Sequence, residues 1–190
     1  DSTGARGVYM NERNIPILTA TTFFLLAVVV VIQFIPQSMP AETNDVVVEK
    51  TSDGYQLNLQ AVLELAEMDS GNGTVEYRGF NFTGPQLLYI FARGVVMLEL
   101  NETGKIHVGE YSGPEDPYGF MDTVTLTRSE YTDMAERTYT WMDANGRSPN
   151  HVGIYVEGSP DITPSLARKI FRQVLVEYRR TGTLPEVVSA

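Results

Sequence analysis

Residues 127–149, TRSEYTDMAERTYTWMDANGRSP, carry the clearest start and stop signals of a helix in this chain of 190 residues. Thr127 and Glu130 have the spacing of a capping box, in which each side chain accepts a hydrogen bond from the other residue's amide. Apolar side chains then recur at helical spacing, and Gly146 supplies a residue that takes the left-handed conformation at a helix C-terminus. Pro149 follows three residues later. The stretch therefore predicts an amphipathic helix with defined ends.

The same pattern returns 36 residues later, in TPSLARKIFRQVLVEYRRTGTLP at 163–185. Thr163 is placed to cap a helix that begins at Pro164, Gly182 ends it, and Pro185 follows three residues later. A valine comes three residues after each of the two prolines, so cap, glycine, proline and valine all align without a gap. Two independently capped helices would share some of these features by chance, but the common offset favours a degenerate internal repeat in 127–190.

A long apolar segment, IPILTATTFFLLAVVVVIQFI at 15–35, has 21 residues and no charged side chain. As a helix it would span about 30 Å, the thickness of one hydrocarbon core. An uncleaved signal peptide is the alternative, but its apolar region is usually shorter, about 7–15 residues. Arg6 and Arg13 precede the segment, and the positive-inside rule then puts the N-terminus in the cytoplasm. The sequence thus predicts a single-pass protein of the cell membrane with an extracellular C-terminal domain.

The predicted fold class is mainly α with a few short β-strands, in which an N-terminal transmembrane helix precedes a small repeat-like extracellular domain. Residues 74–82 alternate in polarity and predict a single strand, and Thr83 with Pro85 predicts the start of a helix. The predicted divisions are a cytoplasmic segment at 1–14, the transmembrane helix at 15–36, a stalk at 37–44, a first half of short strands and helices at 45–108, a Pro/Gly-rich loop without regular structure at 109–126, and two helix-Gly-x-x-Pro units at 127–190.

Composition excludes several classes of function. Lys and Arg number 14 against 24 Asp and Glu, so the net charge of −10 argues against a nucleic-acid partner, which a basic surface would attract. Cysteine is absent, and His107 and His151 are the chain's two histidines, neither at a metal-ligand or triad spacing. We therefore predict no catalytic residues, no metal, no cofactor and no enzymatic activity.

Basic side chains gather in the second repeat-like helix. This predicted helix contains one acidic residue, Glu177. Its basic residues are Arg168, Lys169, Arg172, Arg179 and Arg180. They predict a docking face for an acidic wall polymer or for the acidic flank of a neighbouring copy, with an ordinary solvated helix face as the equal alternative.

Aromatic residues of the first repeat-like unit are candidates for stacking on sugar rings. Trp141 and Tyr139 are the main candidates, and Tyr131 and Tyr155 are further ones. Trp141 lies at helical spacing with apolar neighbours, so a place in the core is the alternative for its side chain.

Three tripeptides match the acceptor pattern for N-glycosylation, at Asn72, Asn81 and Asn101. All three fall within 30 residues on the predicted outer side, and they modestly favour export of this part of the chain.

The segments AERTYTWMDANGRSPNHVGI (135–154) and ARKIFRQVLVEYRRTGTLPEVV (167–188) resemble the pseudomurein-binding repeat of methanogenic archaea. Units of that family pair an amphipathic helix with an ending similar to NG-x-x-P-x-x-V, and PQLLYIFA (85–92) resembles a further typical segment. The proline is absent after Thr103-Gly104, so the resemblance gives no complete unit in the first half.

The resemblance implies a non-catalytic surface protein that attaches to cell-wall or envelope glycan through its helices. Two alternatives stay open. One is a structural subunit of an extracellular filament, pilus or envelope layer, with copies of the chain or other envelope subunits in contact through the apolar segment. The other is an accessory single-pass subunit of a membrane complex. The predicted partners are thus the glycan, the lipid bilayer and, in the alternatives, other envelope proteins.

Overall fold

The computed structural model describes residues 46–71, 73–155 and 160–190. The chain divides into two units, Asp1–Thr43 and Asn44–Ala190, and the fold described below is that of the second. The predicted cytoplasmic segment, transmembrane helix and stalk, at 1–14, 15–36 and 37–44, lie outside the described residues.

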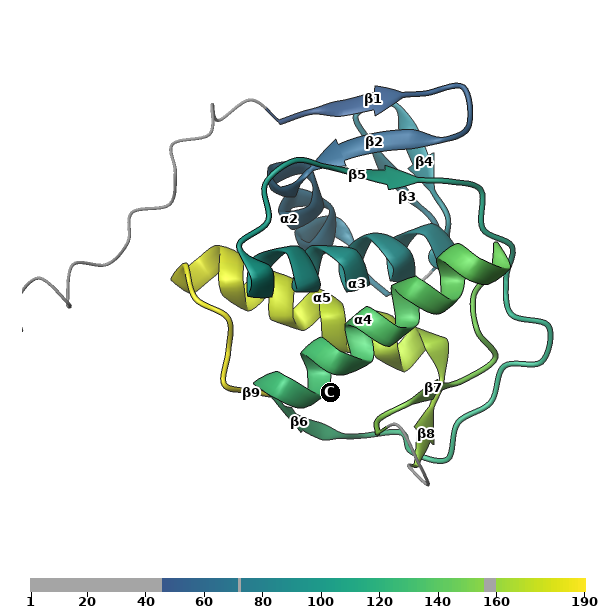
Figure 1. Cartoon of the computed structure of the whole chain (residues 1–190), viewed down its shortest axis with the longest axis vertical. Helices are drawn as coiled ribbons and strands as arrows, with labels where there is room; N and C mark the ends of the chain where they lie inside the picture. The colour runs from purple at the N-terminus through teal and green to yellow at the C-terminus, as the bar shows by residue number, and fades with distance from the viewer. Residues whose placement is uncertain (1–45, 72, 156–159) are drawn as a thin grey trace, which may run out of the picture. The chain divides into compact units, whose positions relative to one another are not determined.

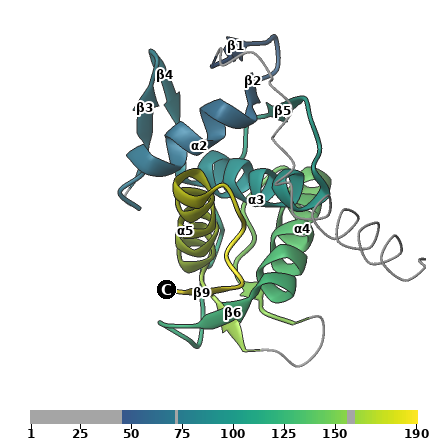
Figure 2. The same cartoon turned by 90° about the vertical axis from the view of Figure 1, so that its left-hand side faces the viewer.

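The second unit contains four helices and nine short strands in its described part (Figures 1 and 2). The helices are α2 (Leu59–Met68), α3 (Gly84–Leu100), α4 (Arg128–Asn145) and α5 (Pro164–Thr181). The strands are β1 (Val48–Lys50), β2 (Tyr55–Asn58), β3 (Val75–Tyr77), β4 (Phe80–Phe82), β5 (Lys105–Val108), β6 (Thr125–Thr127), β7 (Val152–Gly153), β8 (Asp161–Ile162) and β9 (Val187–Ser189).

Each helix lies between two short strands, so the chain runs through four strand–helix–strand units. The units are β2-α2-β3, β4-α3-β5, β6-α4-β7 and β8-α5-β9. The strand after one helix pairs antiparallel with the strand before its partner helix: β3 with β4 and β5 with β2 in the first half, β7 with β8 and β9 with β6 in the second. Each half is thus a pair of units joined at both ends, and β1 adds one outer strand beside β2.

The register of these ladders places one buried pair in each. The four pairs are Leu57–Ile106, Val75–Phe82, Leu126–Val188 and Val152–Ile162, and all eight side chains are at most 9% exposed. Leu57, Phe82, Leu126 and Ile162 each directly precede the N-cap of a helix. A buried residue at that position fixes the angle at which the chain enters the helix.

The N-caps themselves are polar residues that the sequence supplies at the expected places. Thr83 and Gln86 form a reciprocal capping box, and the Thr163 hydroxyl accepts from the amide of Leu166. The Glu130 carboxylate accepts from the amide of Thr127 at 2.7 Å, and this hydrogen bond lowers the pKa of Glu130. The predicted starts of the three long helices are therefore confirmed.

Helix α3 occupies the centre of the fold. It packs against α2, α4 and α5, and twelve of its 17 residues are buried. The approach is close enough that a Cβ at Gly94 would lie 2.8 Å from Cγ1 of Val62 on α2 and 3.5 Å from Cδ2 of Leu175 on α5. The side chains of α3 therefore join both halves into one hydrophobic core.

The predicted fold class needs correction. Nine strands in the described part are more than a few, and the fold is a mixture of helices and paired strands. The predicted single strand at 74–82 is the hairpin β3–β4, which turns at Arg78 and Gly79, both with positive φ. The loop predicted at 109–126 contains the start of β6 and two isolated bridges, Ser112–Arg147 and Met121–Ile162. The strands β6 to β9, of two or three residues each, are too short to show an alternating pattern, so the sequence did not predict them.

The predicted single-pass membrane localisation is also corrected. None of the helices within 46–71, 73–155 and 160–190 combines the length and the apolar character needed to cross a bilayer. The segment on which that prediction depended, 15–36, is not among these residues.

The crossed strand pairing predicts a sharp contrast between neighbouring residues of β6. Leu126→Ala should lower the free energy of unfolding by about 2–5 kcal/mol, because it leaves a cavity opposite Val188. Thr125→Ala, at an exposed position of the same strand, should change it by about 1 kcal/mol or less. Chemical denaturation of both variants provides the measurement, and equal effects would contradict the inward orientation of Leu126.

Candidate functional site

An open groove of about 900 Å³ lies along the C-terminal half of α4, against the chain that follows this helix. The helix contributes one wall, and the segment 147–153 with Tyr118 contributes the other. The side chains that determine its chemistry are those of Glu136, Arg137, Thr140, Trp141, Ala144, Arg147, Asn150, His151 and Tyr118.

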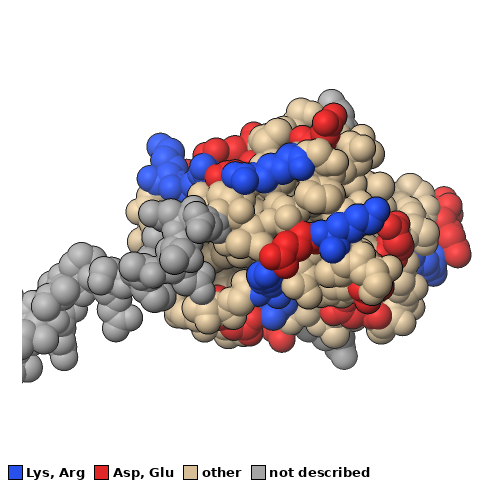
Figure 3. All heavy atoms as spheres, turned by 90° about the horizontal axis from the view of Figure 1, so that it is seen from above, with Lys and Arg blue, Asp and Glu red and all other residues tan. Residues whose placement is uncertain are grey.

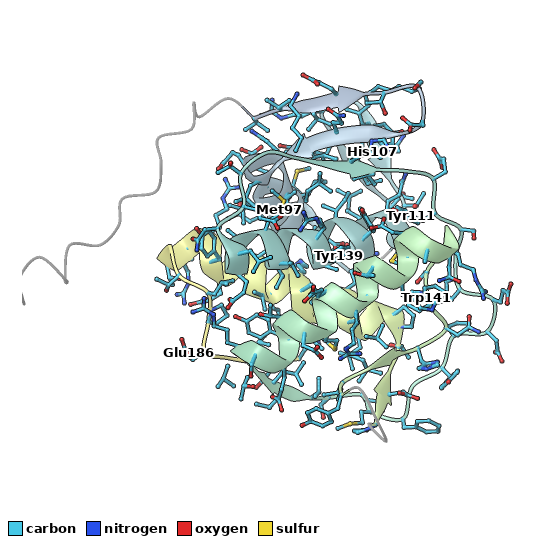
Figure 4. The ribbon with its side chains drawn as sticks, in the orientation of Figure 1. Met97, His107, Tyr111, Tyr139, Trp141 and Glu186 are labelled. Atoms are coloured by element: carbon cyan, nitrogen blue, oxygen red, sulfur yellow. The ribbon has the colours of Figure 1, made fainter. Side chains whose placement is uncertain are left out.

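Helical spacing explains which side of α4 lines the groove. Arg137, Thr140, Trp141 and Ala144 recur at intervals of three or four residues and therefore share one face. Tyr139 is two residues from Trp141, about 200° around the helix, and lies on the other side of α4 (Figure 4). Of the two main aromatic candidates, Trp141 lines the groove and Tyr139 does not.

Arg147 connects the indole of Trp141 with the loop that precedes β6. Its guanidinium lies over the Trp141 ring, 5.6 Å from the centroid, and its Nη1 is 2.8 Å from Oε2 of Glu115. A guanidinium over an indole face is an attractive cation–π contact. The Trp141 side chain is thus held in place while it remains partly exposed.

Arg137 fastens the helix to the opposite wall. It donates to the carbonyl oxygens of Gly153 and Ile154, each at 3.0 Å, and forms an ion pair with Asp133 at 2.7 Å. Since both carbonyls belong to the chain around β7, these bonds set the width of the groove.

Asn150 and Tyr118 complete the outer wall. The Asn150 side-chain oxygen accepts from the amides of Glu115 and Asp116, and its carbonyl accepts from the amide of Tyr118 at 2.9 Å. The Tyr118 ring packs on His151, with centroids 4.5 Å apart and an angle of 32° between the planes. The loop at 109–126, for which the sequence predicts no regular structure, therefore contributes to a wall of the groove through Tyr118.

The groove combines aromatic faces with amide, guanidinium and carboxylate groups. Such a lining suits a ligand that carries both C–H faces and many hydroxyl groups, because the rings cover the former and the polar groups bond the latter. Within the part of the chain that the structure describes, no three His, Asp or Glu side chains converge to hold a metal ion.

The predicted basic face on α5 is only partly a surface. Arg168 is 6% exposed and forms a buried ion pair with Asp69, which is 1% exposed and lies 99 residues away. Nε of Arg168 donates to Oδ2 of Asp69 at 2.8 Å, and Nη1 donates to the carbonyl of Gly73 at 3.2 Å. Arg168 therefore stabilises the contact between the halves and does not reach a ligand.

The other basic residues of α5 differ in their surroundings. Arg179 lies near Glu64 and Glu67, with its Nε 3.3 Å from Oε1 of Glu67, and Arg172 is half-buried. Lys169 is exposed. On the face that Figure 3 shows, seen from above the view of Figure 1, basic and acidic side chains are interspersed.

Three of the four aromatic candidates lie outside the groove. Tyr131 is fully buried and donates to the carbonyl of Pro185, and Tyr155 donates to Glu130. Tyr139 lies under the guanidinium of Arg93 and edge-on to Tyr89, whose pKa burial raises to about 12. Figure 4 shows Tyr139 and Tyr111 on this same side of α4.

The glycosylation candidates have distinct positions. Asn81 is exposed in β4, and Asn101 is exposed at the C-cap of α3 with a φ of 52°. Asn72 lies outside the described residues. Use of these three sites stays a prediction.

Sequence reasoning missed most of the groove. His151 lies at no metal-ligand or triad spacing, and the pattern of the sequence does not mark Tyr118, Arg137, Arg147 or Asn150 as binding residues. The one available clue was their proximity to the Gly146 ending of the repeat unit, because a chain that reverses after a helix must return along it.

The pseudomurein-binding repeat family model matches residues 122–154. The match covers β6, α4 and β7, which form one strand–helix–strand unit, and it confirms the resemblance in the second half of the chain. No curated protein and no solved structure matches the chain. The alternatives of a filament subunit and of an accessory membrane subunit gain no support from this match.

The buried ion pair between Arg168 on α5 and Asp69 at the end of α2 predicts a large effect on stability. Asp69→Ala should lower the free energy of unfolding by about 3–5 kcal/mol, because it leaves the Arg168 charge buried without a partner. Glu67→Ala, which removes a half-exposed partner of Arg179, should cost about 1 kcal/mol or less. Urea denaturation distinguishes the two, and a replacement of both Asp69 and Arg168 by leucine should restore most of the loss.

Proposed function

We propose that this protein is a non-catalytic cell-surface binding protein that holds pseudomurein, or a related cell-wall glycan, in the groove beside α4. One observation carries the proposal: every residue lining the groove except Tyr118 lies within 122–154, the segment that matches the pseudomurein-binding repeat. The segment that matches the family model and the groove thus coincide on one structural unit.

The lining supports a saccharide ligand. Trp141 offers an apolar ring face, while Thr140, Asn150 and Glu136 offer hydroxyl, amide and carboxylate groups in the same groove. A sugar ring has an apolar C–H face and a rim of hydroxyls, so it satisfies both kinds of group at once. The openness of the groove at the surface suits a polymer, whose ends must extend beyond the site.

The network that holds the walls in place favours binding without rearrangement. Arg137 and Arg147 already pair with Asp133, Glu115 and two backbone carbonyls. A site whose side chains are fixed before the ligand arrives loses less conformational entropy on binding.

The proposal is tested by filling the groove. Ala144 is an exposed residue of α4 that lines it, so Ala144→Trp should block the ligand without disturbing the core. Binding of the full chain to purified cell-wall material should fall by about tenfold or more, which is about 1.4 kcal/mol. Sedimentation with the insoluble wall provides the measurement.

The matched control is Glu76→Trp, which adds the same side chain at an exposed position of β3. It should bind as the unaltered protein does, and circular dichroism should show both variants folded. Unchanged binding by a folded Ala144→Trp variant would exclude the groove as the wall site.

The basic side chains of α5 are tested in the same assay. Lys169 is exposed and lies outside the groove, so Lys169→Glu should leave wall binding within about twofold. A loss as large as that of Ala144→Trp would instead place the ligand on α5, as the charge pattern of the sequence predicts.

A further inference from the structure

Phe120 is the most exposed large hydrophobic side chain of the described residues, at 80%. It lies two residues before the segment that matches the repeat family, in the loop between β5 and β6. Single exposed apolar residues are ordinary on protein surfaces. Phe120 differs from such residues in two respects: its backbone is hydrogen-bonded to the next unit, and its ring contacts Tyr118.

The backbone that carries Phe120 is held rigidly. The amide of Phe120 donates to the carbonyl of Asp161 at 2.8 Å, and Met121 forms a bridge with Ile162. Gly119 lies so close to the next unit that a Cβ there would be 2.5 Å from the amide nitrogen of Thr163. The exposed ring is therefore presented by an ordered chain.

Phe120 continues a row of rings that begins in the groove. Its centroid is 5.9 Å from that of Tyr118, edge to face, and Tyr118 packs on His151 at 4.5 Å. Tyr118 and His151 both line the groove, whereas Phe120 lies beyond it. The three rings form a strip from the interior of the groove onto the open surface, which we call the aromatic strip.

We propose that the aromatic strip binds successive sugar rings of the wall ligand, so that the affinity increases with the length of the saccharide. This inference rests on the proposed function. Phe120 is the outer stacking platform, and each sugar ring beyond the one in the groove adds a contact with Tyr118 or Phe120.

The charges beside the aromatic strip favour a neutral chain. Asp116 and Asp122 are exposed on the same loop, as is Glu115, which pairs with Arg147, and the two other carboxylates repel ligands that carry negative charge. A second copy of this chain, with a net charge of −10, meets the same repulsion. Sugar rings without charge pay no such cost and match the narrow row of ring faces.

The experiment compares short and long saccharide fragments of the purified wall by titration calorimetry with the full chain. Affinity of the unaltered protein should rise with fragment length. Phe120→Ala should remove about a tenfold gain for the long fragments and leave the short ones unchanged, while Phe120→Trp should retain the gain. Leu100→Ala, at another exposed apolar residue outside the aromatic strip, is the control.

The outcomes separate this inference from the proposed function. If Ala144→Trp abolishes binding but Phe120→Ala leaves the length dependence intact, the aromatic strip does not bind the chain and the groove still does. Affinity that does not rise with the length of the fragment would also overturn the inference. If neither variant changes binding to the wall, the proposed function itself fails.

Discussion

The pairing of the strand after each helix with the strand before its partner helix is the constraint on which this fold depends. Ladders of two to four residues contribute few backbone hydrogen bonds, yet each contains a buried side-chain pair next to an N-cap. The ladders fix where every helix begins, and the helices in turn bring their apolar faces to α3. Local capping and distant pairing therefore support the same arrangement, which is the mutual consistency expected of a cooperative fold.

The groove depends on this arrangement in a specific way. Helix α4 would expose Trp141 to solvent if the chain after Gly146 did not return along it toward β7. Pairing of β7 with β8 draws that chain back, and the bonds from Arg137 to the carbonyls of Gly153 and Ile154 complete the wall. The groove thus forms because the chain turns back along α4 after Gly146, and the same turn brings β7 to β8.

Sequence patterns predicted the helices well, because caps and stops act within a few residues. Thr83, Thr127 and Thr163 each lie at the predicted N-cap, and Gly146 and Gly182 each take a left-handed conformation after a helix. The pair of units in the first half was not predicted, since the ending after Gly104 lacks the proline of the repeat. Only the ladder between β2 and β5 shows that α3 belongs to a complete unit.

The groove was less predictable than the helices, for a physical reason. Tyr118 and Asn150 meet through a backbone hydrogen bond across 32 residues, and no periodicity encodes such a contact. The charge pattern was misleading for a similar reason. The basic cluster on α5 predicted an exposed docking face, but Arg168 forms a buried ion pair with Asp69, which lies 99 residues away in the sequence. Local sequence shows how many charges a helix carries and not which of them are neutralised within the core.

The crossed pairing also limits how such a module can be enlarged. A single added unit would leave one strand before its helix and one after it without partners, and unpaired strand edges promote aggregation. Growth by duplication is therefore expected to proceed in steps of two units, and viable lengths of an array should contain an even number of helices.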